Sequence, residues 1–283
     1  MRHEQRRELR GLRVIGSWIN DADRRHANTM AAYTADRYVK HYILDMGSTL
    51  GANAGGPHSS VHGQAYIIDQ RKIPQAILAL GAYRFPWWHV DPTPRYTAVG
   101  YFRADVFRPG KWVPTYPNPA FEKMTLRDAY WGAKVVMSFT DEDLRAIVET
   151  AQISNSEAED DLLDVLRKRR DKIGRYWFDK VNPLDRFSVE DAAAPPTAEG
   201  SRGPAADPPV LHFDDLAVTS NLETAEARRY TYRMSLDGEV IGAKRTTDDS
   251  RLSLSVDGTA LASVLDERGR TGEHDRVVRV DLR

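Results

Sequence analysis

The sequence contains no cysteine, which excludes disulfide bonds, thiol catalysis and cysteine-ligated zinc or iron–sulfur sites. It also has almost no net charge, because 40 lysine and arginine side chains are matched by 41 aspartate and glutamate side chains. A chain without a global positive field gives no indication of nucleic-acid or anionic-membrane partners. Motifs of the GxGxxG and Walker types are missing as well, so neither a dinucleotide-binding fold nor a P-loop is predicted.

Long hydrophobic runs are also missing. No stretch approaches the ~20 apolar residues of a membrane-spanning helix, so no membrane span is expected. The amino-terminal run MRHEQRRELR is not followed by the apolar segment of a signal peptide, which predicts a soluble protein, cytoplasmic by default. With 283 residues, of which 41% are hydrophobic, the chain is long enough for one large or two smaller domains.

An amphipathic helix followed by a β-hairpin is predicted near the amino terminus. Over residues 4–19 apolar side chains recur at spacings of three and four, and Asn20 and Asp21 end the pattern. Two short runs rich in β-branched and aromatic residues follow, TMAAY at 29–33 and RYVKHYILD at 37–45, around the turn sequence TADR.

The middle of the chain predicts a long loop and then several helices. Residues 74–81 suit a short helix opened by Pro74, and the segment 84–121 is dense in proline and aromatic residues, as in a long ordered loop. The N-caps predicted for three further helices are Thr125, Thr140 (with Asp143) and Ser156 (with Glu159), the last helix running to about Lys180.

The carboxyl-terminal part of the chain has a different composition. Residues 191–209, DAAAPPTAEGSRGPAADPP, lack aromatic and large aliphatic side chains and are typical of a linker. Beyond them, segments that alternate apolar and polar residues are joined by Asp-Gly pairs at 237–238 and 257–258. The sequence therefore predicts an α+β protein: a mostly helical domain with a small hairpin at 1–190, a linker at 191–209 and a small antiparallel β module at 210–283.

The stretch DADRRHANTM at residues 21–30 carries the candidate chemistry. Phosphoryl transfer requires a carboxylate near the acceptor hydroxyl and cations that neutralise the phosphates. Asp23 and Asn28 are five positions apart after the predicted helix, and the predicted hairpin returns the chain so that Asp45 lies beside Asn28. A carboxylate and an amide oxygen are suitable ligands for Mg²⁺, and Gly47 would allow the tight turn that directs Asp45 into a cleft.

The sequence DRRHAN at 23–28, followed by LDMG at 44–47, resembles the catalytic and metal loops of the protein-kinase-like superfamily. It is closest to the atypical branches, the lipid kinases and the secreted atypical kinases. The resemblance implies a kinase-like C-terminal lobe in which Asp23 is the catalytic carboxylate, Asn28 and Asp45 are Mg²⁺ ligands, and Gly47 lies in the nucleotide site. ATP is the implied phosphate donor, whereas the acceptor is left open between a protein, a lipid and a small molecule.

The motifs also depart from the superfamily pattern. Asp21-Ala22 stands where ordinary protein kinases carry His-Arg, and Met46 replaces the usual phenylalanine. Only 22 residues precede Asp23, too few for the amino-terminal lobe that carries the Gly-rich lid and the strand lysine. We expect this lobe from a longer gene or from another chain, and ATP/Mg²⁺-dependent phosphotransfer once it is present. The alternative is a catalytically inactive kinase-like binding or scaffold protein.

Other conspicuous residues have simpler interpretations. The side chains of residues 24–26 are expected to be solvated, and RKRR at 167–170 is expected to form the exposed face of a long helix. His58 and His62 have the i, i+4 spacing of helical zinc ligands, but the glycines and proline around them argue against a helix. A surface position in an activation-loop-like segment is expected for both histidines instead.

Overall fold

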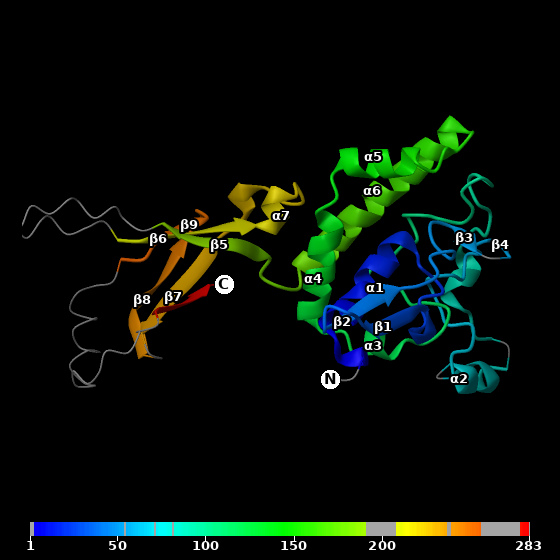
Figure 1. Cartoon of the computed structure of the whole chain (residues 1–283), viewed down its shortest axis with the longest axis horizontal. Helices are drawn as coiled ribbons and strands as arrows, with labels where there is room; N and C mark the ends of the chain where they lie inside the picture. Colours follow the sequence, from blue (N-terminus) through cyan, green and yellow to red (C-terminus); the bar gives the residue numbers. More distant parts are fainter. Residues whose placement is uncertain are drawn as a thin grey trace, which may run out of the picture. The chain divides into compact units, whose positions relative to one another are not determined.

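The structure is a computed structural model that describes residues 3–53, 55–70, 72–80, 82–190, 208–236, 239–255 and 278–282. The chain is an α+β protein that divides into two compact units, Met1–Val181 and Asn182–Arg283. Helices dominate the first unit and antiparallel strands dominate the second (Figure 1). None of the helices in these ranges combines the length and the apolar character that a membrane span requires.

The first unit is built around four helices, one predicted from periodicity and three from their caps. Helix α1 packs against α4 and α6, and α5 packs along α6 (Figure 1). Thr125 and Thr140 cap α4 and α5 as predicted, but Asn155 rather than Ser156 caps α6, through a bond from the backbone of Ala158. The described helices of this unit are α1 (Arg7–Ile19), α2 (Ile73–Leu78), α3 (Pro119–Glu122), α4 (Leu126–Met137), α5 (Asp141–Glu149) and α6 (Ser156–Phe178), with the 3-10 turns η1 (His3–Gln5), η2 (His26–Asn28) and η3 (Pro86–His89).

Helices α1 and α4 approach each other closely because a glycine faces the contact from each side. A Cβ atom on Gly132 would lie 2.6 Å from the backbone oxygen of Gly11 and 2.9 Å from the Cβ atom of Val14. Arg10 of α1 also donates two hydrogen bonds, of 2.6 and 2.8 Å, to the buried carboxylate of Asp128 in α4. These contacts hold α1, from whose carboxyl end the candidate site departs.

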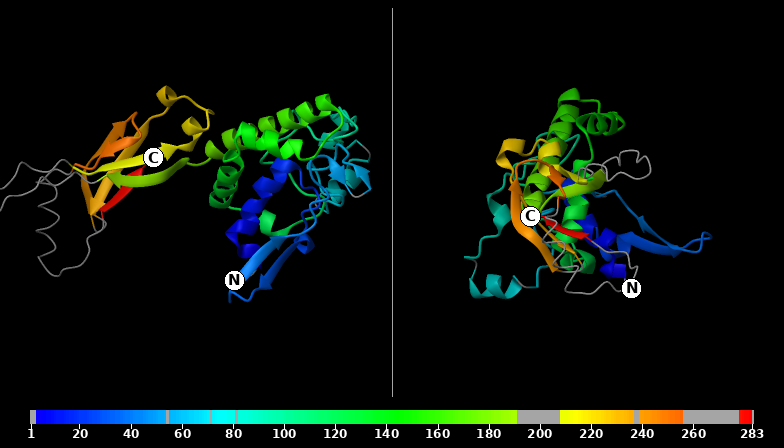
Figure 2. Two further views of the ribbon diagram at one scale, coloured as in Figure 1. Left: turned by 45° about the horizontal axis from the view of Figure 1, so that its top comes forward. Right: turned by 90° about the vertical axis from the view of Figure 1, so that its left-hand side faces the viewer.

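The predicted hairpin follows α1. Strands β1 (Thr29–Tyr33) and β2 (Val39–Ile43) pair antiparallel, with Thr29 opposite Ile43. The hairpin projects away from the helices of the unit (Figure 2), and neither strand contains a buried residue. Large apolar or aromatic side chains that are at least 40% exposed, on the hairpin or just after it, are Met30, Tyr33, Tyr38, Val39, Tyr42, Ile43, Leu44 and Met46.

A long ordered segment with little regular structure connects the hairpin to α3. It contains the two-residue strands β3 (Ala52–Asn53) and β4 (Gly56–Pro57), which pair with each other. Its aromatic residues pack on one another, since the ring of Phe85 stacks on Trp87 at 4.5 Å between centroids and meets Trp88 edge-on at 5.3 Å. The loop predicted from proline and aromatic content is therefore ordered by its own rings.

The second unit contains two three-stranded antiparallel sheets, in the orders β10-β7-β8 and β5-β6-β9. Buried side chains from both sheets, including Phe213, Tyr230 and Leu252, form one core. The elements of this unit are β5 (Leu184–Glu190), β6 (Val210–Asp215), α7 (Leu216–Thr219), η4 (Ala225–Ala227), β7 (Tyr230–Leu236), β8 (Glu239–Thr247), β9 (Arg251–Ser253) and β10 (Val278–Leu282).

The boundary between the units lies before strand β5, at Val181–Asn182, and not after it as predicted. The sequence-based boundary at residue 190 leaves β5 with the helices, whereas β5 pairs with β6 and its Leu184 lies in the core of the second unit. The reason is that β6 is a central strand and needs a hydrogen-bonding partner on each edge. Of the predicted linker, residues 191–207 lie outside the described residues, and so do the Asp-Gly turns at 237–238 and 257–258.

Candidate functional site

The candidate site begins where α1 ends. Asn20 terminates the helix in a left-handed conformation (φ 52°) and turns the chain into the loop 21–28. The backbone N–H of Ala22 then donates to the carbonyl of Ser48, and the carbonyl of Ala22 accepts from the N–H of Thr115. The loop is therefore held between two distant segments immediately before the predicted catalytic residue.

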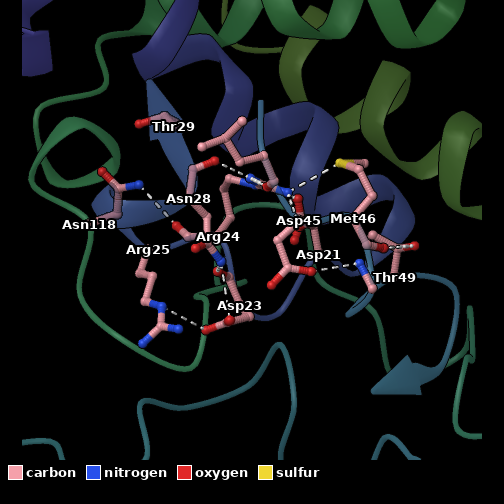
Figure 3. Close-up of polar contacts among 12 residues, drawn as sticks. Asp21, Asp23, Arg24, Arg25, Asn28, Thr29, Asp45, Met46, Thr49 and Asn118 are labelled. Atoms are coloured by element: carbon pink, nitrogen blue, oxygen red, sulfur yellow. Dashed lines mark hydrogen bonds and ion pairs between the residues drawn. The ribbon is translucent and has the colours of Figure 1, made fainter. Parts of the chain in front are cut away.

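Arg24 joins the loop to the end of the hairpin. Its side chain is fully buried, at 0% exposed, although the sequence predicted a solvated residue. The guanidinium donates to the backbone carbonyls of Asn28 (2.6 Å), Leu44 and Asp45 (2.9 Å) (Figure 3). One cation therefore joins the end of the loop to the residues that follow β2. The prediction for Arg24 is wrong because its burial depends on carbonyl groups that a different segment supplies.

Asp21 balances the charge of Arg24. Its Oδ2 atom accepts a 2.6 Å hydrogen bond from Nε of Arg24 inside the unit. Burial raises the pKa of Asp21 above its ordinary value despite Arg24, and the nearby carboxylates of Asp23 and Asp45 raise it further. The Oδ1 atom of Asp21 is buried without a hydrogen-bond partner among the described residues. Three carboxylates thus lie within electrostatic reach of one another, and Asp21 is the buried one.

Asp45 itself, rather than Gly47, makes the left-handed turn after β2. The φ angle of Asp45 is 52°, whereas Gly47 is not among the described residues with positive φ. Oδ1 of Asp45 accepts the backbone N–H of Gly47 at 3.1 Å, a local bond that helps an aspartate to adopt this conformation. The predicted role of Gly47 is therefore corrected, because this residue supplies a backbone donor to Asp45 and does not make the turn.

The loop and the hairpin bring Asp23, Asn28 and Asp45 into one region (Figure 3). Nδ2 of Asn28 donates to the carbonyl of Asp23 at 2.8 Å and to its carboxylate at 3.1 Å. The N–H of Leu44 donates to the carbonyl of Asn28 at 2.9 Å, which places the next residue, Asp45, beside Asn28. Across the described ranges no hydrogen bond uses Oδ1 of Asn28, and the carboxylate of Asp23 is 24% exposed. The side chains of Asp23 and Asn28 are therefore directly bonded. Asp45 follows Leu44, whose backbone is bonded to that of Asn28.

The oxygen donors of this region determine which metal it suits. Among the described residues, no cluster of three or more His, Asp and Glu side chains has the arrangement of a metal site. The amide oxygen of Asn28 and the carboxylate of Asp45 are hard oxygen donors, which Mg²⁺ prefers, and Mg²⁺ usually completes its shell with water and substrate phosphates. The donor types present therefore suit Mg²⁺, but they are too few to form a protein cage for it.

His58 is buried, so the expected surface position is wrong for this residue. It is 3% exposed, and its ring stacks on that of His62 at 4.5 Å between centroids. Nδ1 of His58 lies 3.3 Å from Nδ2 of Asn20, and Nε2 has no partner among the described residues. Burial, with His62 and Arg169 nearby, lowers the pKa of His58 to about 4, so the ring is neutral at pH 7.

Asp21, Arg24 and Asn118 are site residues that the sequence interpretation missed. Nδ2 of Asn118 donates to the carbonyl of Arg24 at 2.9 Å, while its Oδ1 caps α3. Asp21 and Arg24 are three positions apart, so the spacing of opposite charges was a usable signal for their pairing. The contact of Asn118 spans 94 positions, and no local pattern indicates it.

Comparisons of the chain with protein-family models, with curated proteins and with solved structures gave no match.

Proposed function

We propose that the first unit is the C-terminal lobe of an atypical kinase, which transfers phosphate from ATP with Mg²⁺ when an amino-terminal lobe is present. The observation that carries the proposal is a set of two links: Arg24 bonds the backbone carbonyls of Asn28 and Asp45, and the side chain of Asn28 bonds Asp23. The residues follow one another in the order helix, loop, hairpin, turn. Kinase-like catalytic and metal loops occur in this order. A plain capped helix followed by a hairpin needs neither a buried arginine nor polar side chains that converge.

In this proposal Asp23 acts on the phosphate acceptor. Its carboxylate accepts the proton of the acceptor hydroxyl as the phosphate is transferred, and the bond from Nδ2 of Asn28 holds it in place. Oδ1 of Asn28 and the carboxylate of Asp45 would hold Mg²⁺, which supplies positive charge opposite the phosphates. The acceptor class, whether a protein, a lipid or a small molecule, stays open.

The exposed hairpin supports the need for a second lobe. A two-stranded hairpin is marginally stable alone in water, and β1 and β2 bury no residue in this structure. Tyr42, Leu44 and Met46 are 40–48% exposed next to Arg24 and Asp45. Apolar side chains gathered at the edge of a polar site are typical of a surface that another part covers. An amino-terminal lobe would cover this surface and close the nucleotide site.

Metal binding tests the proposal without the second lobe. Mn²⁺ can replace Mg²⁺ and broadens the NMR signals of nuclei close to it. With ATP present, we expect selective broadening of the backbone amides of residues 23, 28 and 44–47. Asp45→Asn should remove the effect, whereas Asp36→Asn, a carboxylate in the turn of the same hairpin, should retain it. Equal broadening in both variants would contradict the proposed ligands.

Catalysis provides the second test. The chain alone should bind ATP·Mg²⁺ weakly and turn it over slowly, because phosphates exposed to water gain little from the protein charges. With an amino-terminal lobe supplied, Asp23→Ala should lower turnover by about 10²–10⁴-fold if Asp23 accepts the proton. Phosphate release and nucleotide affinity are the measurements. A complete protein that binds no nucleotide and stays inert would favour the alternative, a kinase-like scaffold that has lost the chemistry.

A further inference from the structure

A polar cavity lies in the first unit, and none of Asp23, Asn28 and Asp45 lines it. Its volume is about 560 Å³, within the range of small-molecule sites. The walls come from the end of α1, from residues 62–64, from the loop 101–112 and from Arg169 of α6. The cavity is therefore built from segments that the fold brings together rather than from one flexible loop.

Positive charge dominates the lining of this cavity. The cationic side chains that line it are Lys72, Arg103, Arg108, Lys111 and Arg169, and one carboxylate, Asp105, accompanies them. Arg103 is paired with Asp105, and Lys72 lies 3.2 Å from Asp69. Arg108, Lys111 and Arg169 have no carboxylate within ion-pair distance in the described part of the chain. Three cations thus line one cavity without forming an ion pair of their own.

Arg169 is the most unusual of these cations, because it is 4% exposed. Its guanidinium donates to the carbonyls of Trp18 (2.7 Å), Ser17 and Arg103 (2.7 Å), and its ring neighbour Phe107 lies 3.8 Å from the guanidinium carbon. Each guanidinium nitrogen thus donates one bond to a carbonyl, and carbonyl dipoles leave the net charge uncompensated. The exposed helix face predicted for residues 167–170 is wrong at this position, since the loop 101–112 covers Arg169.

Burial disfavours the charged form of Arg169, which lines the cavity, and of two cations near its walls, Lys172 and Arg13. Burial lowers the pKa of Arg169 to about 9, and it also lowers the pKa of Lys172, on which Arg169 and Arg108 act in the same direction. Arg13, which donates to the carbonyls of Gly110 and Trp112 in the cavity wall, likewise has a pKa lowered by burial. An anion in the cavity would favour the charged form of Arg169, the one of these three cations that lines it.

We propose that this cavity binds a phosphorylated small molecule that carries at least two negative charges. Uncompensated guanidinium and ammonium groups recognise phosphate oxygens through charge-assisted hydrogen bonds. The aromatic walls Tyr101, Phe107 and Trp112 offer an apolar surface for the remainder of the ligand. The site goes beyond the proposed phosphotransfer, because it needs no residue of the kinase-like loops.

One residue in the wall of the cavity, Trp112, provides a signal that reports on binding. The indole Nε1 of Trp112 donates to Oδ1 of Asn20 at 2.9 Å, and Gly63 lies against both side chains with φ +85°. The indole N–H of a tryptophan gives a well-separated NMR signal. A ligand in the cavity should shift the signal of Trp112 together with the amides of Gly63 and Gln64.

Titration with inorganic pyrophosphate tests the site in the full chain. We expect saturable binding by calorimetry, with the shifts at Trp112 described above. The double variant Arg108→Gln/Lys111→Gln changes two exposed rim residues and should weaken binding by at least about tenfold without unfolding the protein. Arg127→Gln, an exposed arginine on α4 outside the cavity, is the matched control and should bind as the native chain does.

Two results would overturn the proposal. One is the absence of pyrophosphate binding to the native chain at millimolar concentration. The other is an equal loss of affinity in Arg127→Gln and in the double variant, which would show non-specific attraction to positive charge. Arg169→Lys provides a further check, since it keeps the charge but loses the planar fork and should weaken binding if it folds.

The phosphate could be free in solution or part of a lipid headgroup, and flotation with vesicles separates these sources. Vesicles of phosphatidylcholine with phosphatidic acid should bind the chain only if the ligand is a headgroup, and pyrophosphate should then compete with them. Pyrophosphate binding without vesicle binding assigns the site to a soluble ligand. Vesicle binding that the Arg108→Gln/Lys111→Gln variant retains would contradict the proposed cavity as its cause.

Discussion

Arg24 and Asp21 form an ion pair of 2.6 Å in which both side chains are almost completely buried, at 0% and 2% exposed. The remaining donors of Arg24 go to three carbonyls on either side of the candidate site and to Sδ of Met46. Removing one partner of a buried pair leaves the other charge uncompensated, which is far more costly than losing an exposed pair. The pair therefore provides a direct test of what holds the loop against the hairpin.

Arg24→Met should lower the free energy of unfolding of the first unit by about 3–5 kcal/mol, because it strands the carboxylate of Asp21 and three carbonyl groups. Arg25→Met is the matched control, since Arg25 is adjacent and 46% exposed, and it should have a small effect. Urea unfolding followed by tryptophan fluorescence measures both. Similar losses in the two variants would show that Arg24 does not hold the loop.

The stability of the first unit should depend on pH through His58. Its folded pKa of about 4 lies below the ordinary value of 6.5, so between these values the unfolded chain binds the additional proton. Stability should therefore decrease as pH falls from about 6.5 to about 4, by up to about 3 kcal/mol from this residue. His58→Asn should flatten the profile in that window, whereas replacement of the exposed His89 by Asn should leave it unchanged.

Asp128 should matter at lower pH. Burial alone would raise its pKa, but hydrogen bonds from Arg10 and Thr125 outweigh burial and lower the pKa to about 2. This contribution is complete above about pH 4 and is lost as pH falls toward 2. At neutral pH, Asp128→Asn should destabilise the unit by about 2–4 kcal/mol. Asp143→Asn removes an equivalent capping box from the exposed start of α5 and should cause a smaller loss in thermal unfolding.

Two glycines of the first unit should respond differently to alanine. Gly63 has φ +85°, and a Cβ atom there would lie 2.3 Å from Oδ1 of Asn20, so Gly63→Ala should destabilise by about 2 kcal/mol or more. A Cβ atom on Gly47 would meet only Oδ1 of Asp45, at 3.1 Å. Gly47→Ala should therefore keep the fold with a small change in Tm. A folding defect in Gly47→Ala would indicate that the left-handed turn is not confined to Asp45.

The revised boundary predicts which fragments fold. A fragment of residues 182–283 includes β5 and should give a cooperative unfolding transition by circular dichroism. A fragment of residues 210–283 lacks Leu184 and the strand that pairs with β6, so it should be unfolded or aggregate through the free edge of β6. Equal stability of the two fragments would show that β5 is not part of the second unit and that the boundary lies in the linker at 191–209.

Local signals were sufficient for most helices and for the hairpin. Thr125 and Thr140 are followed three positions later by an aspartate, and both form capping boxes. The same reasoning placed the α6 cap one residue late, because Asn155 and Ser156 are both good caps and only the bond to Ala158 distinguishes them. A short-range pattern thus fixes that a helix starts, but it does not choose between neighbouring caps.

Long-range contacts explain what the sequence could not indicate. Arg24 and Arg169 have the surroundings of solvated arginines in the sequence, and both are buried because distant backbone carbonyls receive their donors. Strand β5 is similar, since its partner β6 follows after a segment of low complexity. The approach of Asn28 to the residue before Asp45 was predictable, because a short hairpin links them. The burial of Arg24 beside these residues and of Arg169 at the polar cavity was not predictable.

The register of β1 against β2 fixes the spacing between residues of the candidate site. Thr29 is opposite Ile43, so the separation of Asn28 and Asp45 is set at the open end of the hairpin and not at its tip. Residues added to or removed from the turn at 34–38 would lengthen or shorten the tip while the site keeps its spacing. A single residue inserted within either strand would reverse the faces of the residues beyond it and separate the two side chains. Insertions and deletions should therefore be tolerated in the turn of the hairpin and should damage the site when they fall within its strands.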